Sequence, residues 1–161
     1  MAKARTAADA KSSEIRINEQ KWGKSLMTAG FTLLPNMIFA HQAELGLRPT
    51  DLNILMHLLS YWWSPGDLPH PSKRTIATMM GIDPRTVQRR IAALEKRGLI
   101  ARQSRTGAHR GTQTNIYHFD GLITAATIFA KQHIEEREKK AKANAEKAVK
   151  LAKAKPNLVV V

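Results

Sequence analysis

The strongest constraint on the fold is a glycine at position 81, set between two short amphipathic segments. Ser72 precedes the first segment and is suited to cap a helix that runs to Met80, because its hydroxyl can accept a hydrogen bond from a free helical amide. Gly81 tolerates the left-handed backbone conformation that a sharp turn after a helix requires. Asp83 and Pro84 then begin a second helix, with a capping carboxylate followed by proline at the first helical position. The pattern predicts two helices joined by a tight turn.

The second helix is predicted to end before Gly98 and to bury one face. At about 100° per residue, Val87, Ile91 and Leu94 fall on the same side of this helix. Ala77, in the first helix, is small enough to let the two helices cross closely. These positions predict a shared core beneath the turn.

The other elements follow from hydrophobic periodicity and turn residues. In chain order they are a short strand at 30–34 stopped by Pro35, helices at 36–44 and 51–63 (the second capped by Thr50), a loop at 64–71, strands at 99–101 and 115–119, and a helix from 120 onward. The glycine-containing segment 104–114 joins the two later strands as a hairpin with a basic tip. Trp62, Trp63 and Phe119 are predicted to lie in the core. Beyond Glu135 the Ala/Lys-rich sequence favours a helix but lacks an apolar stripe, so we expect it to be frayed or solvated.

Positive charge is concentrated in one block of the chain. The sequence has 26 Lys and Arg against 13 Asp and Glu, a net charge of +13. Residues 70–110 hold 10 of the basic side chains and 2 of the acidic ones, a local net charge of +8. Such a field predicts a polyanionic partner, most commonly nucleic acid, with a membrane surface as the competing interpretation.

Several function classes lack the residues that they need. The chain has no cysteine, which excludes disulfides and thiol chemistry, and its 6 histidines show no metal-ligand spacing. We find no phosphate-binding glycine loop, nucleophile motif or paired carboxylates, so no metal, cofactor or enzymatic activity is expected. No stretch approaches the ~18 consecutive apolar residues of a membrane span. We therefore expect a cytoplasmic protein that is not bound to a membrane and has no evident small-molecule effector.

The outward side of the second helix carries side chains that suit base recognition in double-stranded DNA. Arginine can pair with guanine, glutamine with adenine, and threonine can touch a thymine methyl group. The residues predicted to contact bases lie in the first two turns and are Arg85, Thr86, Gln88 and Arg89.

A second group of residues is predicted to contact DNA phosphates. Such contacts fix the position of the protein on the duplex but do not distinguish one base sequence from another. Its members around the two helices are Ser72, Lys73, Arg74, Arg90, Lys96 and Arg97. The hairpin adds Arg102, Arg105, His109 and Arg110. The alternative interpretation of all these charges is a solvated surface with no ligand.

The segment from Pro71 to Ile100 has the sequence PSKRTIATMMGIDPRTVQRRIAALEKRGLI. Its P-S-x-x-T-hydrophobic-A entry, its T-V-Q-R-R and L-E-x-x-G-L-I motifs and the later Asn-Ile-Tyr strand resemble the winged helix-turn-helix domain of plasmid and phage replication-initiator-like proteins and mobile-element regulators. A looser likeness connects it to GntR-type DNA-binding domains. The resemblance spans about residues 31–122 and implies a mainly α fold with a small β-hairpin wing, sequence-specific DNA binding and a homodimer. Arg90 departs from the pattern, since many helix-turn-helix proteins have a small or apolar residue there.

We therefore predict three parts: a flexible basic arm at 1–25, a winged helix-turn-helix domain at 26–121, and a C-terminal helix with a basic tail at 122–161. The apolar face of residues 122–134 is the predicted dimer contact, and the tail either binds DNA non-specifically or forms an oligomerisation helix. The leading hypothesis is a transcriptional regulator of a bacterial plasmid or phage, associated with the nucleoid or plasmid. The alternatives are a replication-initiation or segregation protein that binds repeated sites, and a non-specific architectural or RNA-binding protein.

Overall fold

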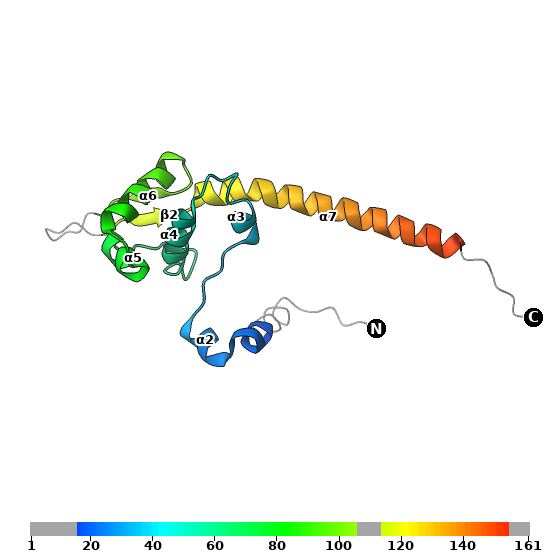
Figure 1. Ribbon diagram of the computed structural model, residues 1–161, viewed down its shortest axis with the longest axis horizontal. Coiled ribbons are helices and arrows are strands. Elements are labelled where there is room, and N and C mark those ends of the chain that lie inside the picture. Colours follow the sequence, from blue (N-terminus) through cyan, green and yellow to red (C-terminus); the bar gives the residue numbers. More distant parts are fainter. Residues whose placement is uncertain (1–15, 106–113, 155–161) are drawn as a thin grey trace, which may run out of the picture. The chain divides into compact units, whose positions relative to one another are not determined.

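The computed structural model describes residues 16–105 and 114–154 (Figure 1). Its helices are α2 (Lys24–Ala29), α3 (Asn36–Ala40), α4 (Pro49–Leu59), α5 (Lys73–Met80), α6 (Pro84–Lys96) and α7 (Asp120–Ala154). Its strands are β1 (Ala101–Gln103) and β2 (Ile116–His118). The chain divides into two units at residues 33 and 34. In the described part of the first unit, residues 16–22 are also helical, and no side chain between residues 16 and 33 is buried.

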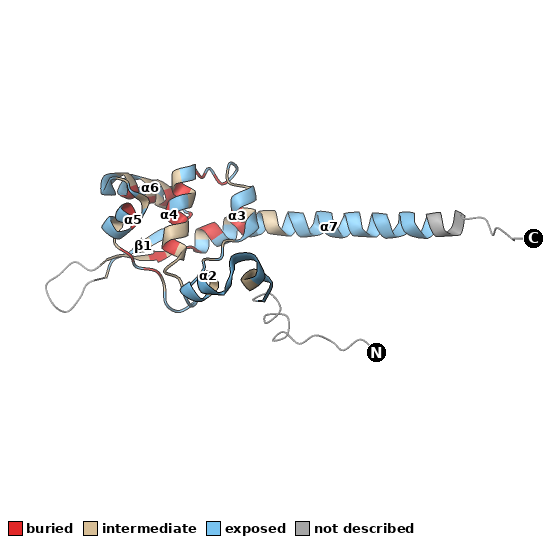
Figure 2. Cartoon of the chain, turned by 60° about the horizontal axis from the view of Figure 1, so that its bottom comes forward, coloured by how far each residue is buried: buried red, intermediate tan, exposed pale blue. Residues whose placement is uncertain are grey.

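The core of the second unit forms where α4, α5 and α6 meet. Val87, Ile91 and Leu94 have no exposed surface, which confirms the predicted inward face of α6. Figure 2 shows buried positions on all three of these helices. The fully buried side chains that α4 and α5 contribute to the same cluster are Ile54, Leu55, Leu58 and Ile76. Burial of this apolar surface is the main term that holds the three helices together.

The turn between α5 and α6 has the predicted geometry. The Ser72 hydroxyl accepts a hydrogen bond from the Thr75 amide at 2.9 Å and caps α5. Gly81 is left-handed, with φ 63° and ψ 33°. The Asp83 carboxylate accepts from the Arg85 amide at 2.6 Å and caps α6, whose first residue is Pro84. Each local signal in the sequence therefore corresponds to a cap or a turn in the structure.

β1 and β2 form an antiparallel pair in which Arg102 lies opposite Tyr117. The loop before α5 lies along β2, because the Tyr117 amide donates to the Pro69 carbonyl at 2.9 Å. The hairpin tip at 106–113 lies outside the described residues. Gly121 brings the start of α7 against the end of α6, where a Cβ at this position would be 1.7 Å from the Gly98 carbonyl oxygen.

α7 uses part of its apolar face inside its own unit. Leu122 and Ala126 are buried, and Phe129 stacks on His41 with ring centroids 4.2 Å apart. The predicted dimer face at 122–134 is therefore partly covered within the unit, and the large apolar side chains that stay exposed on it are Ile123 and Ile134. The tail beyond Glu135 continues the helix to residue 154, and all side chains from 131 to 150 are exposed, so the expectation of a solvated helix is confirmed.

Three predictions about the region before α5 were wrong. Residues 30–35 form no strand. A strand there would need a neighbouring strand to hydrogen-bond with its backbone, and the described part of the chain offers none. The N-cap of α4 is Arg48 rather than Thr50, because Pro49 occupies the first helical position and the Asp51 carboxylate accepts from the Arg48 amide at 2.9 Å.

The third error concerns Trp63, which was predicted in the core and is 72% exposed. The reason is that α4 ends at Leu59, so Trp63 lies in the following turn and no longer shares the buried helical face. Trp62 and Phe119 do pack together, with ring centroids 5.3 Å apart. Phe119 is buried, whereas Trp62 is half-buried against the core.

Candidate nucleic-acid interface

The face of α6 opposite its buried side is exposed and basic. Arg85, Arg89 and Lys96 are exposed there, and the small Ala92 lies between them. Thr86 is half-buried and receives a long hydrogen bond of 3.4 Å from the Arg89 guanidinium. A helix with this division of faces can approach a groove closely, because its cations point away from the domain and no bulky apolar side chain stands between them.

One flank of α6 is held by two polar contacts. Near its start, the Lys73 ammonium of α5 donates to the Gln88 side-chain oxygen at 3.1 Å. Near its end, the Arg102 guanidinium of β1 donates to Glu95, with Nε at 2.9 Å from a carboxylate oxygen. The hydrogen bond from Arg102 is the main cause that lowers the pKa of Glu95 below its ordinary value. These contacts connect α6 to α5 and to the hairpin.

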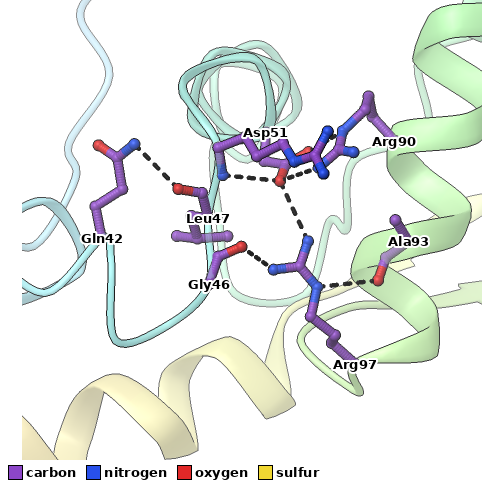
Figure 3. A network of polar contacts seen from close by, with 8 residues as sticks. Gln42, Gly46, Leu47, Asp51, Arg90, Ala93 and Arg97 are labelled. Carbon is purple, nitrogen blue, oxygen red and sulfur yellow. Dashed lines mark hydrogen bonds and ion pairs between the residues drawn. The ribbon is translucent and has the colours of Figure 1, made fainter.

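The other flank is held by a buried carboxylate that sequence reasoning did not single out. Asp51 of α4 has no exposed surface and accepts from Arg90 Nε at 2.6 Å and Arg90 Nη2 at 2.5 Å. Arg97 Nη2 lies 3.2 Å from the same carboxylate and Arg97 Nη1 donates to the Gly46 carbonyl. Figure 3 shows these groups converging between α4 and α6. We call Asp51, Arg90, Arg97 and the Gly46 carbonyl the Asp51 network.

The pKa of Asp51 reflects two opposed effects. Burial raises the pKa, but the hydrogen bonds from the Arg90 guanidinium and from the Arg48 amide outweigh burial and bring the pKa below its ordinary value. The carboxylate therefore stays ionised and pairs with the guanidinium. The one signal for it in the sequence was Arg90, an arginine at a position where many helix-turn-helix proteins have a small or apolar residue.

The structure changes the predicted set of phosphate contacts. Arg90 is withdrawn from the set, because its guanidinium is paired with a buried carboxylate and its side chain is 17% exposed. Arg97 and Arg102 also have carboxylate partners within the chain, Asp51 and Glu95, although Arg97 shares the single charge of Asp51 with Arg90. The Ser72 hydroxyl serves as a helix cap. The remaining candidates near the turn are Lys73, Arg74 and Lys96, of which Arg74 and Lys96 are exposed.

The predicted hairpin contacts are only partly within view. Arg105 lies at the base of the hairpin tip, where its Nε donates to the Thr114 carbonyl at 3.2 Å and its Nη2 to the Thr114 hydroxyl at 3.3 Å. His109 and Arg110 lie outside the described residues.

Comparison with known proteins agrees with this geometry. Residues 45–100 match the family model described as a helix-turn-helix domain. The matched segment contains α4, α5 and α6 and agrees with their helix-turn-helix arrangement. With the β1–β2 hairpin after it and the long α7, the second unit has a mainly helical, winged helix-turn-helix fold. A helix-turn-helix domain indicates DNA binding.

Two solved structures resemble the chain. The N-terminal domain of the DnaD protein from Geobacillus kaustophilus HTA426 is 18% identical, with 71% of this chain and 93% of that chain covered and a TM-score of 0.52. At this identity the likeness concerns the fold alone. The YusO protein from Bacillus subtilis is 22% identical over 93% of this chain and 100% of that chain, with a TM-score of 0.40. No curated protein matches the chain.

The described residues contain neither a metal-binding cluster nor a membrane-spanning helix. Between residues 16 and 105 and between 114 and 154, no group of three or more His, Asp or Glu side chains is placed to hold a metal ion. The same part of the chain contains no helix that is both long enough and apolar enough to span a bilayer.

Proposed function

We propose that the protein binds double-stranded DNA in a sequence-specific manner, with α6 in the major groove. The observation that carries the proposal is the division of α6 into two faces. Val87, Ile91 and Leu94 have no exposed surface, whereas Arg85 and Arg89 are exposed in the first two turns, where a helix in the groove meets base edges. In this arrangement Arg85, Thr86, Gln88 and Arg89 contact bases, with arginine suited to guanine and glutamine to adenine.

Phosphate contacts on both sides of α6 would set its position in the groove. Lys73 and Arg74 lie in the first turn of α5, and Lys96 lies in the last turn of α6. Arg105, at the base of the hairpin tip, and the basic residues beyond it would reach the backbone beside the groove. Such contacts carry affinity and no sequence information.

The protein would act as a dimer on DNA, through the apolar face of α7 between residues 122 and 134, on which Ile123 and Ile134 are exposed. Each subunit would contact one half-site, with the half-site centres ~34 Å or a multiple of that distance apart. Sedimentation of the free protein and of its DNA complex tests this, and a monomer in both states would refute the dimer. The proposed role in the cell is to regulate, in the cytoplasm, the transcription of genes carried by a plasmid or phage.

Selection from a pool of duplexes with a randomised centre tests the main proposal. Sequence-specific binding predicts enrichment of one motif, and footprinting on the source DNA then separates the roles. A single protected operator over a promoter supports regulation, while an array of direct repeats favours replication initiation or segregation. Equal affinity for all duplexes favours an architectural protein, and preference for structured RNA refutes the assignment to DNA.

A further inference from the structure

We infer that Asp51 is a positioning residue for base recognition, which sets the rotation of α6 about its own axis and so the direction of Arg85 and Arg89. The inference rests on the proposed function, since it concerns how that DNA-contacting face is held. Asp51 itself lies in α4 and has no exposed surface, so it cannot contact DNA and can affect binding only through the orientation of α6.

The geometry of the ion pair between Arg90 and Asp51 restricts the rotation of α6 about its own axis. The guanidinium presents Nε and Nη2 to the two carboxylate oxygens of Asp51, at 2.6 Å and 2.5 Å. Because both the guanidinium and the carboxylate are planar, two parallel hydrogen bonds fix their relative orientation as well as their distance. Arg97 lies seven residues, about two turns, after Arg90 on the same flank and donates to the same carboxylate at 3.2 Å. One buried group is thus bonded to α6 at two points along the helix.

The contacts on the opposite flank do not replace this restraint. Lys73 and Gln88 form one hydrogen bond between flexible side chains, and Gln88 is exposed. Glu95 and Arg102 are partly exposed, with 35% and 25% of their side-chain surface accessible. The carboxylate that is closed off from water lies on the α4 side, where burial strengthens its charge-assisted hydrogen bonds.

A small rotation of α6 has unequal effects on the two kinds of DNA contact. Side-chain atoms lie about 5–6 Å from a helix axis, so a rotation of roughly 20° moves them by about 2 Å. Hydrogen-bond distances vary only between about 2.7 and 3.2 Å, so a shift of about 2 Å breaks a bidentate base contact. A lysine ammonium on a flexible stem can still reach a phosphate after such a shift. Loss of Asp51 should therefore lower discrimination between sequences before it lowers general affinity.

The test compares Asp51→Asn, Arg90→Lys and Asp67→Asn with the unaltered full chain. Asp67→Asn is the matched control, because it makes the same chemical change at an exposed loop position. Affinity is measured for two probes, the duplex that the unaltered protein selects from a random pool and a random-sequence duplex, at one salt concentration. Circular dichroism establishes that each variant is folded at the temperature used. If Asp51→Asn is too unstable to measure, Arg90→Lys tests the same ion pair, because it removes the bidentate geometry and keeps the positive charge.

For Asp51→Asn, the ratio of the two affinities should fall about tenfold, the loss of one bidentate base contact. Affinity for the random duplex should stay within about twofold, because the phosphate contacts remain. Arg90→Lys should lower the ratio by a smaller factor, and Asp67→Asn should leave it unchanged.

Three results would overturn the inference. These are an unchanged ratio in folded Asp51→Asn, an equal loss on both probes, or the same loss in Asp67→Asn. A different result would refute the proposed function itself. If the unaltered protein enriches no motif from the random pool, it does not bind DNA sequence-specifically, and the positioning role of Asp51 is refuted as well.

Discussion

Arg90 and Asp51 are separated by 39 residues and form a bidentate ion pair between α6 and α4, with hydrogen bonds of 2.6 Å and 2.5 Å. Removing one member of a buried pair leaves the other without its partner. We expect Arg90→Leu to lower the free energy of unfolding by about 3 kcal/mol. Urea denaturation measures the change. Arg89→Leu, at the neighbouring exposed position, should cost less than about 0.5 kcal/mol, and similar values for the two variants would contradict the role of the pair.

Stability should fall in acid through the same carboxylate. The pKa of Asp51 is lower in the folded chain than its ordinary value of 3.8, so its contribution is present above that value and is lost as the pH falls through the folded-state pKa. Urea midpoints measured from pH 6 downward should therefore decline below about pH 4. In Asp51→Asn the decline should be shallower, whereas Asp67→Asn should keep the slope of the unaltered protein. Parallel curves for all three proteins would show that Asp51 does not titrate as described.

Gly81, which ends α5, and Gly121, near the start of α7, must be glycine for different reasons. A Cβ on Gly81 would meet nothing within 4 Å, but the residue has φ +63°, so Gly81→Ala should cost about 1 kcal/mol through backbone strain alone. Gly121→Ala should cost more, because its Cβ would overlap the Gly98 carbonyl at 1.7 Å. Gly66→Ala, with open space and no positive φ, is the control and should be nearly neutral. Thermal denaturation ranks the three, and a larger loss at Gly81 than at Gly121 would be inconsistent with this geometry.

Base contacts and phosphate contacts should separate in binding experiments. We expect Arg89→Ala to cost about 1–3 kcal/mol on the selected duplex and to relax base preference at one position. Arg74→Ala, an exposed change in the first turn of α5, should weaken binding to all duplexes alike and lower the slope of log affinity against log salt by about 1. Fluorescence anisotropy titrations at several salt concentrations measure both quantities. An identical pattern for the two variants would argue against a base contact by Arg89.

The C-terminal part of α7 should contribute to affinity without being needed for folding. Every side chain from residue 131 to 150 is exposed, so a chain ending at Ile134 should keep the unfolding temperature of the winged domain. Removal of the lysines should weaken binding to every duplex and flatten the salt dependence, because fewer counterions are released. Loss of discrimination between duplexes, with general affinity intact, would assign this segment a different role.

The sequence alone determined the features that depend on neighbours within one or two turns. Ser72, Gly81 and Asp83 act through their own backbone angles and the nearest amides, so two capped helices and the turn between them could be predicted without any knowledge of the rest of the chain. Helical periodicity likewise placed Val87 inward and Arg85 outward.

Only the tertiary structure decided which partner a side chain has across the fold. Periodicity shows that Arg90 lies on a flank of α6, but whether it meets a phosphate or a carboxylate depends on where α4 packs, and therefore on Asp51. The same limit explains Trp63, whose burial depended on where α4 ended, and α7, part of whose apolar face packs within its own unit. Local propensity acts over a few residues, whereas burial and ion pairing depend on segments that only folding brings together.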